Sequence, residues 1–189
     1  MSAVQAARVR QPALAATEVI RHRRAFSASE CSTIIDLADN LEAAKDQFQN
    51  YGEVRGASTI WWLPTAKAPK WLTQRLRELM REAAADYEFD ISLPMEDLKL
   101  MAYRCGNRVP WHVDCGGRAF TRKLTLTLLL SSPATYNGGK LTLANYSADL
   151  HRDIGDVVIF PSFMAHKVTT VDRGTRHTLI AWAHGKPFR

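Results

Sequence analysis

From about residue 97 onward the chain consists of short runs rich in β-forming residues, and this pattern limits the fold more than any other feature. In order, the runs are DLKLMAYR, KLTLTLLLS, GKLTLAN, GDVVIFP, HKVTTV and HTLIAWAH. Turn-forming segments separate them, among them SSPATYNGG, RDIG and DRG. Closely spaced strands joined by such turns are typical of an antiparallel sandwich or barrel.

Two amphipathic segments precede these strands. Residues 26–47 are predicted to form a helix, because Ser27 and Glu30 make an S-x-x-E capping box and apolar residues follow at helical spacing. Residues 68–89 are predicted to form a second helix with one apolar side, and residues 57–64 a strand that ends at a proline. The sequence therefore predicts an α+β domain in which helices brace one face of a β-barrel.

The length of 189 residues favours a single domain. We expect residues 1–20 to be a poorly ordered tail and residues 21–189 to be one domain, with helical support at 27–90 and a barrel core at 97–185. No apolar run has the length of a membrane span, and no apolar segment follows the early arginines as in a signal peptide. The three cysteines lack CxxC spacing, which fits a reducing compartment, so a cytoplasmic location is expected.

The net charge of +6 and the pI of about 9.4 suggest anionic partners, including nucleic acid. The basic residues gather in RVR (8–10), RHRR (21–24) and KWLTQRLRELMR (70–81). A mobile tail and a solvated helix face explain the same charge. We prefer this second interpretation, because no nucleic-acid-binding motif accompanies the charge.

A candidate metal site begins in YRCGNRVPWHVDC, where His112 and Asp114 stand one residue apart. On an extended backbone residues i and i+2 point to the same side, so both side chains can reach one metal ion. His166, after FPSFMA, is the candidate third ligand. Two imidazoles and one carboxylate form the facial triad of non-haem Fe(II) oxygenases. The alternative is a chance pattern, since the chain has six histidines.

Arg176 strengthens the first interpretation. It follows the DRG turn at the head of the next predicted strand, where antiparallel pairing can return it to the barrel interior. A buried guanidinium needs an anionic partner, and no acidic residue flanks it on that strand. A carboxylate cosubstrate would supply this partner through a two-pronged charged hydrogen bond. The alternative is an exposed arginine at a strand end.

These motifs resemble the prolyl-4-hydroxylase-like branch of the Fe(II)/2-oxoglutarate-dependent dioxygenases, and within it the bacterial PKHD-type hydroxylases. The resemblance rests on Tyr103-x-x-Gly106 before the His112-x-Asp114 pair, NGGKLTL (137–143), GDVVIFPSFMAH (155–166) and RGTR with Trp182 (173–182). It covers roughly residues 22–185. It implies a double-stranded β-helix, which is a jelly-roll or cupin-like barrel, braced by N-terminal helices.

The resemblance also implies cofactors and residue roles. Fe(II), 2-oxoglutarate and O2 would be required, with ascorbate as a further candidate. His112, Asp114 and His166 would bind Fe(II) and make up the catalytic centre, while Arg176, Tyr103 and Thr125 would hold 2-oxoglutarate, with Thr178 as an alternative to Thr125. One departure is Val109, which stands where many relatives carry tyrosine or phenylalanine on the substrate side. The substrate is therefore not carried over from the family.

The function expected is hydroxylation of an unactivated C–H of an amino acid, a peptidyl residue or a small metabolite, with succinate and CO2 as co-products. An AlkB-like nucleic-acid demethylase shares the triad, but its R-x-N-x-T-x-R run is replaced here by RHTLIAW. Nucleic acid and membrane are accordingly not expected as partners. A non-catalytic cupin-like binding protein or a zinc hydrolase could also carry two histidines and an aspartate. The sequence leaves the substrate and the oligomeric state open.

Overall fold

The structure is a computed structural model that describes residues 17–44, 58–92, 95–146 and 150–188. Its strands are β1 (Ile20–His22), β2 (Ala43–Ala44), β3 (Thr59–Leu63), β4 (Leu98–Tyr103), β5 (Val109–His112), β6 (Arg122–Leu129), β7 (Tyr136–Gly138), β8 (Leu141–Leu143), β9 (Val157–Pro161), β10 (His166–Val168), β11 (Val171–Gly174) and β12 (Arg176–His184). Its helices are α1 (Ala28–Asp36) and α2 (Lys70–Asp86), with 3-10 turns η1 (Leu37–Asn40), η3 (Gly117–Ala119) and η4 (Pro133–Thr135).

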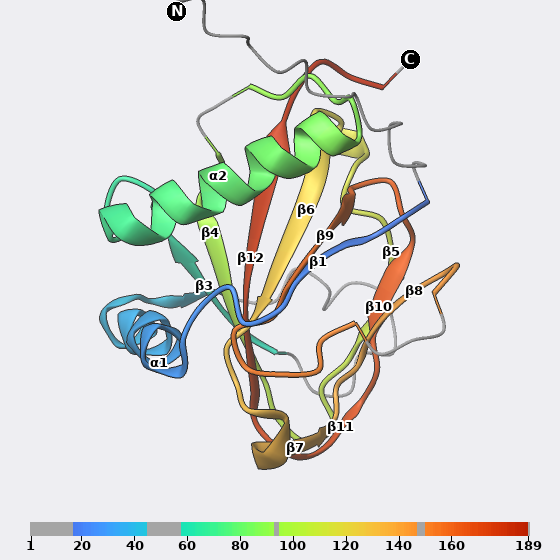
Figure 1. Cartoon of the computed structure of the whole chain (residues 1–189). Helices are drawn as coiled ribbons and strands as arrows, with labels where there is room; N and C mark the ends of the chain where they lie inside the picture. The colour runs from blue at the N-terminus through green and yellow to red at the C-terminus, as the bar shows by residue number, and fades with distance from the viewer. Residues whose placement is uncertain (1–16, 45–57, 93–94, 147–149, 189) are drawn as a thin grey trace, which may run out of the picture.

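The strands form an antiparallel barrel of the expected kind. A seven-stranded sheet has the order β1-β9-β6-β12-β4-β3-β2, and a three-stranded sheet, β5-β10-β8, packs against one of its faces (Figure 1). The ribbon β11-β7 lies at the lower end in Figure 1. Both helices lie on the other side of the large sheet, so the prediction that helices brace one face is confirmed.

Alternation along the central strands separates the two faces of the large sheet. On β6, Leu124, Leu126 and Leu128 are fully buried in the core that faces the helices. Thr125 and Thr127 point the opposite way, into the barrel. The sheet therefore has an apolar outer face under the helices and an inner face that carries polar side chains.

Helix α2 lies across the outer face of the large sheet (Figure 1). Leu72, Leu76 and Met80 recur at helical spacing and are fully buried in the helix–sheet core, as the amphipathic pattern predicts. Burying one such side chain stabilises the fold by roughly 1.5–3 kcal/mol. The two described α-helices both lack the length and apolar content needed to cross a membrane.

The predicted helix at residues 26–47 is correct at its start and wrong in its length. The capping box is present, since Ser27 Oγ accepts from the Glu30 N–H at 3.2 Å and Glu30 Oε2 accepts from the Ser27 N–H at 2.8 Å. The helix ends at Asp36, and η1 follows. Ala43–Ala44 then form β2, because the edge of β3 offers backbone hydrogen bonds that outweigh local helix propensity. Residues 45–47 lie outside the described residues.

The prediction that DRG (172–174) forms a turn is wrong, because these residues belong to β11, which pairs with β7. Two glycines allow this close pairing. A Cβ on Gly138, at φ +74°, would lie 2.1 Å from the Thr170 carbonyl oxygen, and a Cβ on Gly174, at φ +76°, would lie 2.2 Å from the Thr135 carbonyl oxygen. The segment around 136–138, expected as part of a turn, is therefore held against β11.

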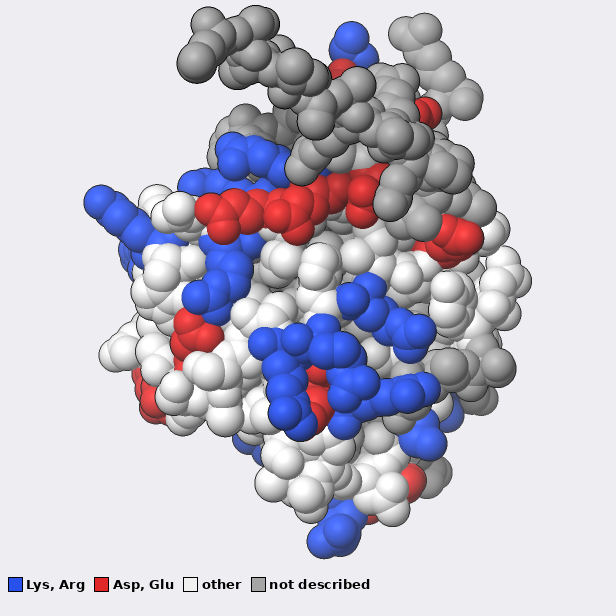
Figure 2. Space-filling view, in the orientation of Figure 1, with Lys and Arg blue, Asp and Glu red and all other residues white. Residues whose placement is uncertain are grey.

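Part of the expected N-terminal tail belongs to the fold. Residues 1–16 lie outside the described residues, whereas Ile20 begins β1 and is paired with Ile159 of β9. Figure 2 shows basic side chains grouped around acidic ones on the face that carries β1. Arg24 donates to Asp153 Oδ2 at 2.7 Å, so part of the basic charge of RHRR is paired within the protein.

Candidate active site

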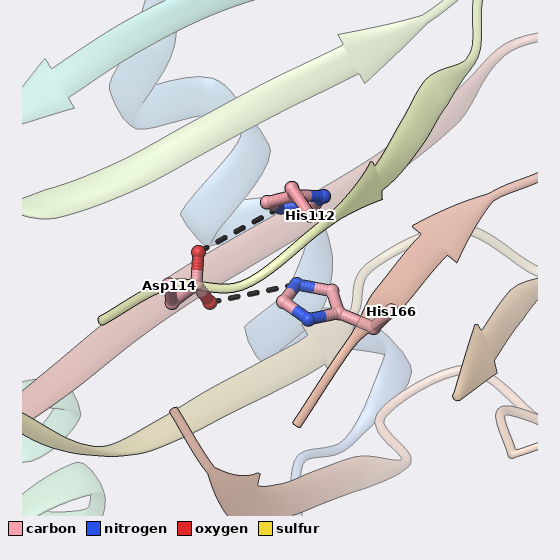
Figure 3. Close-up of side chains that lie close together, drawn as sticks. All are labelled: His112, Asp114 and His166. Carbon is pink, nitrogen blue, oxygen red and sulfur yellow. Dashed lines mark ion pairs between the residues drawn. The ribbon is translucent and has the colours of Figure 1, made fainter. Parts of the chain in front are cut away.

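The three predicted metal ligands meet where β5 and β10 run side by side. His112 ends β5 and is the register partner of His166, the first residue of β10. Asp114 follows two residues after His112, and its backbone N–H donates to the Ser162 carbonyl at 2.8 Å. This bond ties the segment after β5 to the loop that leads into β10. All three side chains therefore point toward one another (Figure 3).

The distances within this group suit a single metal ion. One ligand atom from each residue lies within 4.8 Å of the others, and His166 Nε2 is 3.5 Å from Asp114 Oδ2. His112 Nδ1 lies 2.9 Å from the Pro110 carbonyl, and His166 Nδ1 lies 3.0 Å from the Met164 carbonyl. Because a carbonyl oxygen only accepts, both Nδ1 atoms carry the proton, and each Nε2 lone pair is left for the metal.

The electrostatics of the group favour the ligating protonation states. Burial, and after it the neighbouring His166, lowers the pKa of His112, which favours the neutral imidazole. Burial by itself would raise the pKa of Asp114, but His166, His112 and the hydrogen bond from Thr125 lower the pKa overall. Thr125 Oγ1 donates to Asp114 Oδ2 at 2.8 Å and accepts from Ser162 Oγ at 3.0 Å. Neutral imidazoles and a carboxylate are the forms that bind a metal.

Two imidazole nitrogens and one carboxylate oxygen fit Fe(II) by their chemistry. This donor set, with the remaining coordination positions left to other ligands, is the one used by non-haem Fe(II) oxygenases. The three residues line a cavity of about 900 Å³, which leaves room for further ligands beside a metal. In the described part of the chain this is the sole group of at least three His, Cys, Asp or Glu side chains placed to hold a metal ion.

Arg176 lines the same cavity and is almost fully buried. It is the register partner of Tyr103 across β12 and β4, so both side chains point into the barrel. The guanidinium carbon lies 5.3 Å from the centre of the Tyr103 ring. The hydroxyl of Thr178, next along the inner face of β12, is buried without a hydrogen-bond partner among the described residues. This end of the cavity therefore combines a buried cation with polar hydroxyl groups.

The structure places the predicted cosubstrate residues as follows. Tyr103 stands beside Arg176, with its hydroxyl 3.1 Å from Met101 Sδ. Thr125 instead stands beside the metal ligands, where it holds the carboxylate of Asp114. Thr178 is on the strand of Arg176. The binding of 2-oxoglutarate by these residues stays a prediction.

The cavity wall carries several aromatic and basic residues. Trp62, Trp111 and Trp182 line the cavity; Trp111 is 49% exposed, whereas Trp182 is buried. Arg122 packs over the Trp182 ring at 3.8 Å and donates to Glu96 Oε1 at 3.0 Å, which fixes this wall. Among the described residues that line the cavity, Asp114 is the one carboxylate. A substrate would therefore meet aromatic surfaces and positive charge on the way to the metal ligands.

Sequence reasoning missed several residues of the site. Trp62 is not singled out as a site residue by the sequence, but it lines the cavity because β3 pairs with β4. Lys99, its register partner, lines the cavity as well. His151 lies apart from the three candidate metal ligands, and the sequence gives no sign of its contact with Arg176. The alternation of β3 could have placed Trp62, whereas no local signal marks His151.

Comparison with known proteins finds similarity over the part of the chain that carries this site. Residues 98–184 match the model of the 2OG-Fe(II) oxygenase superfamily. A PKHD-type hydroxylase of Crocosphaera subtropica is 40% identical over 72 residues, which cover 36% of this chain and 32% of the relative. In the first three curated relatives the matched segment spans between 32% and 42% of the relative's length.

Two solved structures share the fold. A Pseudomonas putida prolyl-4-hydroxylase superimposes with a TM-score of 0.68 at 20% identity, over 89% of this chain and 92% of that one. A prolyl hydroxylase from Trichoplax adhaerens, solved with a hypoxia inducible factor peptide fragment, gives 0.69 at 18% identity over 88% and 83%. These matches confirm the expected double-stranded β-helix. Residues 98–184, just under half of the chain, are thus similar to the 2OG-Fe(II) oxygenase superfamily, and PKHD-type hydroxylases are among the proteins that the chain resembles.

Proposed function

We propose that the protein is an Fe(II)- and 2-oxoglutarate-dependent dioxygenase that hydroxylates an unactivated C–H bond and releases succinate and CO2. The observation that carries this proposal is that His112, Asp114, His166 and the buried Arg176 line one cavity. A non-catalytic binding protein would have no need for both a metal-ligand set and a buried cation beside it. The substrate class is an amino acid, a peptidyl residue or a small metabolite.

His112, Asp114 and His166 would hold the metal. With Fe(II) held there, O2 would be the oxidant of the C–H bond, and 2-oxoglutarate would supply the second pair of electrons as it is converted to succinate and CO2. The protein residues keep the ligands in place: the Pro110 and Met164 carbonyls fix the two imidazoles. Thr125 holds the carboxylate of Asp114 in the same way. Such supporting hydrogen bonds orient metal ligands and raise their affinity.

Arg176 would bind the distal carboxylate of 2-oxoglutarate. A guanidinium presents a planar fork that pairs with both oxygens of a carboxylate. Because Arg176 is 2% exposed, the pair would form away from water, where charged hydrogen bonds are stronger. Tyr103, beside the guanidinium, is the proposed neighbour of the same carboxylate.

The substrate would enter past Trp111, the exposed aromatic residue of the cavity wall, toward Trp62 and the buried Trp182. An aromatic, partly exposed entrance suits an amino acid within a peptide as well as a small metabolite. The Trichoplax adhaerens neighbour was solved with a peptide fragment, which supports a peptidyl substrate. The free state of the three cysteines supports a cytoplasmic location.

The test is succinate formation by the purified protein with Fe(II), 2-oxoglutarate and ascorbate. We expect slow turnover without substrate in the wild type and its loss in His166→Ala, which removes one metal ligand. The matched control is His177→Ala, since His177 lies on β12 next to Arg176 but bonds to Ser131 outside the cavity. Candidate amino acids and peptides would then be ranked by how much they stimulate succinate release.

Two outcomes would contradict the proposal. One is a wild type that shows neither turnover nor metal-dependent binding of 2-oxoglutarate. The other is equal turnover in the wild type and His166→Ala, because the metal would then be held elsewhere or the activity would belong to a contaminant.

A further inference from the structure

Arg176 has an unusual partner for a buried cation. A buried guanidinium normally pairs with a carboxylate. In the described part of the chain, however, its hydrogen-bond partner is a histidine: Arg176 Nη2 lies 3.3 Å from His151 Nδ1. His151 precedes β9 and is itself buried. It lines a second, smaller cavity of about 120 Å³ together with Arg176.

The surroundings of His151 decide which ring nitrogen carries the proton. His151 Nε2 lies 3.2 Å from the backbone carbonyl of Thr127 and 3.1 Å from its Oγ1. The carbonyl oxygen can only accept, so Nε2 is the donor. In the neutral ring Nδ1 then has a lone pair, and it accepts from Arg176. The two ring nitrogens of His151 therefore have matching partners: Nε2 donates to Thr127, and Nδ1 accepts from Arg176.

His151 also stays uncharged. Burial, and after it the charge of Arg176, lowers the pKa of His151 to about 3. The nearby carboxylate of Asp156 is engaged elsewhere, because its oxygens accept the backbone N–H groups of Arg24, Arg152 and Asp153. Arg176 thus has a neutral acceptor on its protein side, and its positive charge is not cancelled there.

The stem of Arg176 is held from a second direction. Gly139 packs so closely that a Cβ at this position would lie 2.9 Å from Arg176 Cδ. The same Cβ would lie 2.8 Å from Val171 Cγ2. Its φ of +60° is one that glycine adopts freely. The aliphatic stem is therefore packed in place while His151 fixes the guanidinium.

We propose that His151 is a positioning residue that orients the Arg176 guanidinium toward a carboxylate arriving from the large cavity. This inference rests on the proposed function, since the arriving carboxylate is the distal one of 2-oxoglutarate. A neutral acceptor restrains the guanidinium group without forming an ion pair that would compete with the ligand's carboxylate. A carboxylate in the same place would form an internal ion pair and weaken the attraction for the ligand.

The test is calorimetric titration of 2-oxoglutarate into the protein loaded with Mn(II), which replaces Fe(II) without turnover. His151→Leu removes the acceptor and keeps an apolar side chain in the buried site. His151→Asn restores an acceptor, because its Oδ1 is as many bonds from Cβ as Nδ1. His177→Leu is the control on the same strand as Arg176. A second ligand, 2-oxobutanoate, has the metal-binding keto acid but lacks the distal carboxylate.

We expect the Kd for 2-oxoglutarate to rise about tenfold in His151→Leu, the size expected for one hydrogen bond to a charged group. His151→Asn should recover most of this loss, and His177→Leu should bind like the wild type. The Kd for 2-oxobutanoate should not change in His151→Leu. This discrimination between ligands separates positioning of Arg176 from general damage to the fold.

Equal Kd values for 2-oxoglutarate in the wild type and His151→Leu would overturn the inference and leave the proposed function intact. Equal weakening of both ligands, without recovery in His151→Asn, would also overturn it, because the effect would then be structural. A wild type that does not bind 2-oxoglutarate with Mn(II) would overturn both the inference and the proposed function.

Discussion

The buried, neutral state of His151 predicts how the stability of the protein depends on pH. In the folded protein, burial and then Arg176 lower the pKa of this imidazole to about 3. In the unfolded chain the pKa is about 6.5. Between these values the unfolded state binds more protons, so the free energy of unfolding falls as pH falls below about 6.5. Between about pH 7 and about pH 5, protonation of this single group in the unfolded chain lowers the free energy of unfolding by about 2 kcal/mol.

The assay is urea unfolding of metal-free protein at both pH values, for the wild type and His151→Asn. The variant lacks this titrating group, so its free energy of unfolding should fall by about 2 kcal/mol less than that of the wild type between the two pH values. All other titrating groups are shared, and the difference between the two proteins isolates His151. An identical pH dependence in the two proteins would refute the reasoning, because His151 would then be accessible to protons in the folded state.

Three further predictions concern the fold. Gly155→Ala should prevent stable folding, because its Cβ would lie 1.8 Å from a backbone carbonyl oxygen. Gly106 has a similar φ and nothing within 4 Å of a Cβ, so Gly106→Ala should lower the free energy of unfolding by only about 1 kcal/mol through backbone strain. Comparable losses of stability in the two variants would contradict this prediction. Leu126→Ala should lower the free energy of unfolding by about 2–5 kcal/mol, since the side chain is fully buried; a loss below about 1 kcal/mol would mean that the core collapses around the cavity. Ser27→Ala should lower the free energy of unfolding by about 1 kcal/mol, because the helix cap is lost. The control Ser32→Ala, at an exposed position of the same helix, should change it little. Equal free energies of unfolding for the two variants in urea would exclude a role for the capping box.

The cavity also limits what the substrate can be. Its walls carry Lys99 and Arg122 besides Arg176, and Asp114 is the one carboxylate that the described residues contribute to the lining. Arg122 is partly neutralised, because it forms an ion pair with Glu96 just outside the cavity. A substrate with an excess of positive charge would therefore meet repulsion on the way to the metal. Candidate peptides for the succinate assay are best chosen neutral or acidic around the target residue.

Much of this protein can be read from its sequence, because the decisive patterns are local. The S-x-x-E box predicted the start of α1, and helical periodicity predicted α2. Turn-separated β-forming runs predicted β4, β6, β9 and β12. The His112-x-Asp114 spacing predicted that these two side chains lie close together, as they do. In each case a residue and its neighbours within a few positions determine the outcome.

The tertiary structure decided what depends on contacts between distant segments. Residues 43–44 form a strand because β3 lies beside them, although their local sequence favours a helix. Thr125 donates to Asp114 because β6 brings it beside the candidate metal ligands, although the two residues lie on separate segments. His151 faces Arg176 only because the segment before β9 passes the head of β12. Such pairings depend on chain topology, which no local spacing of residues encodes, so the neutral support of the buried arginine became visible only in the folded protein.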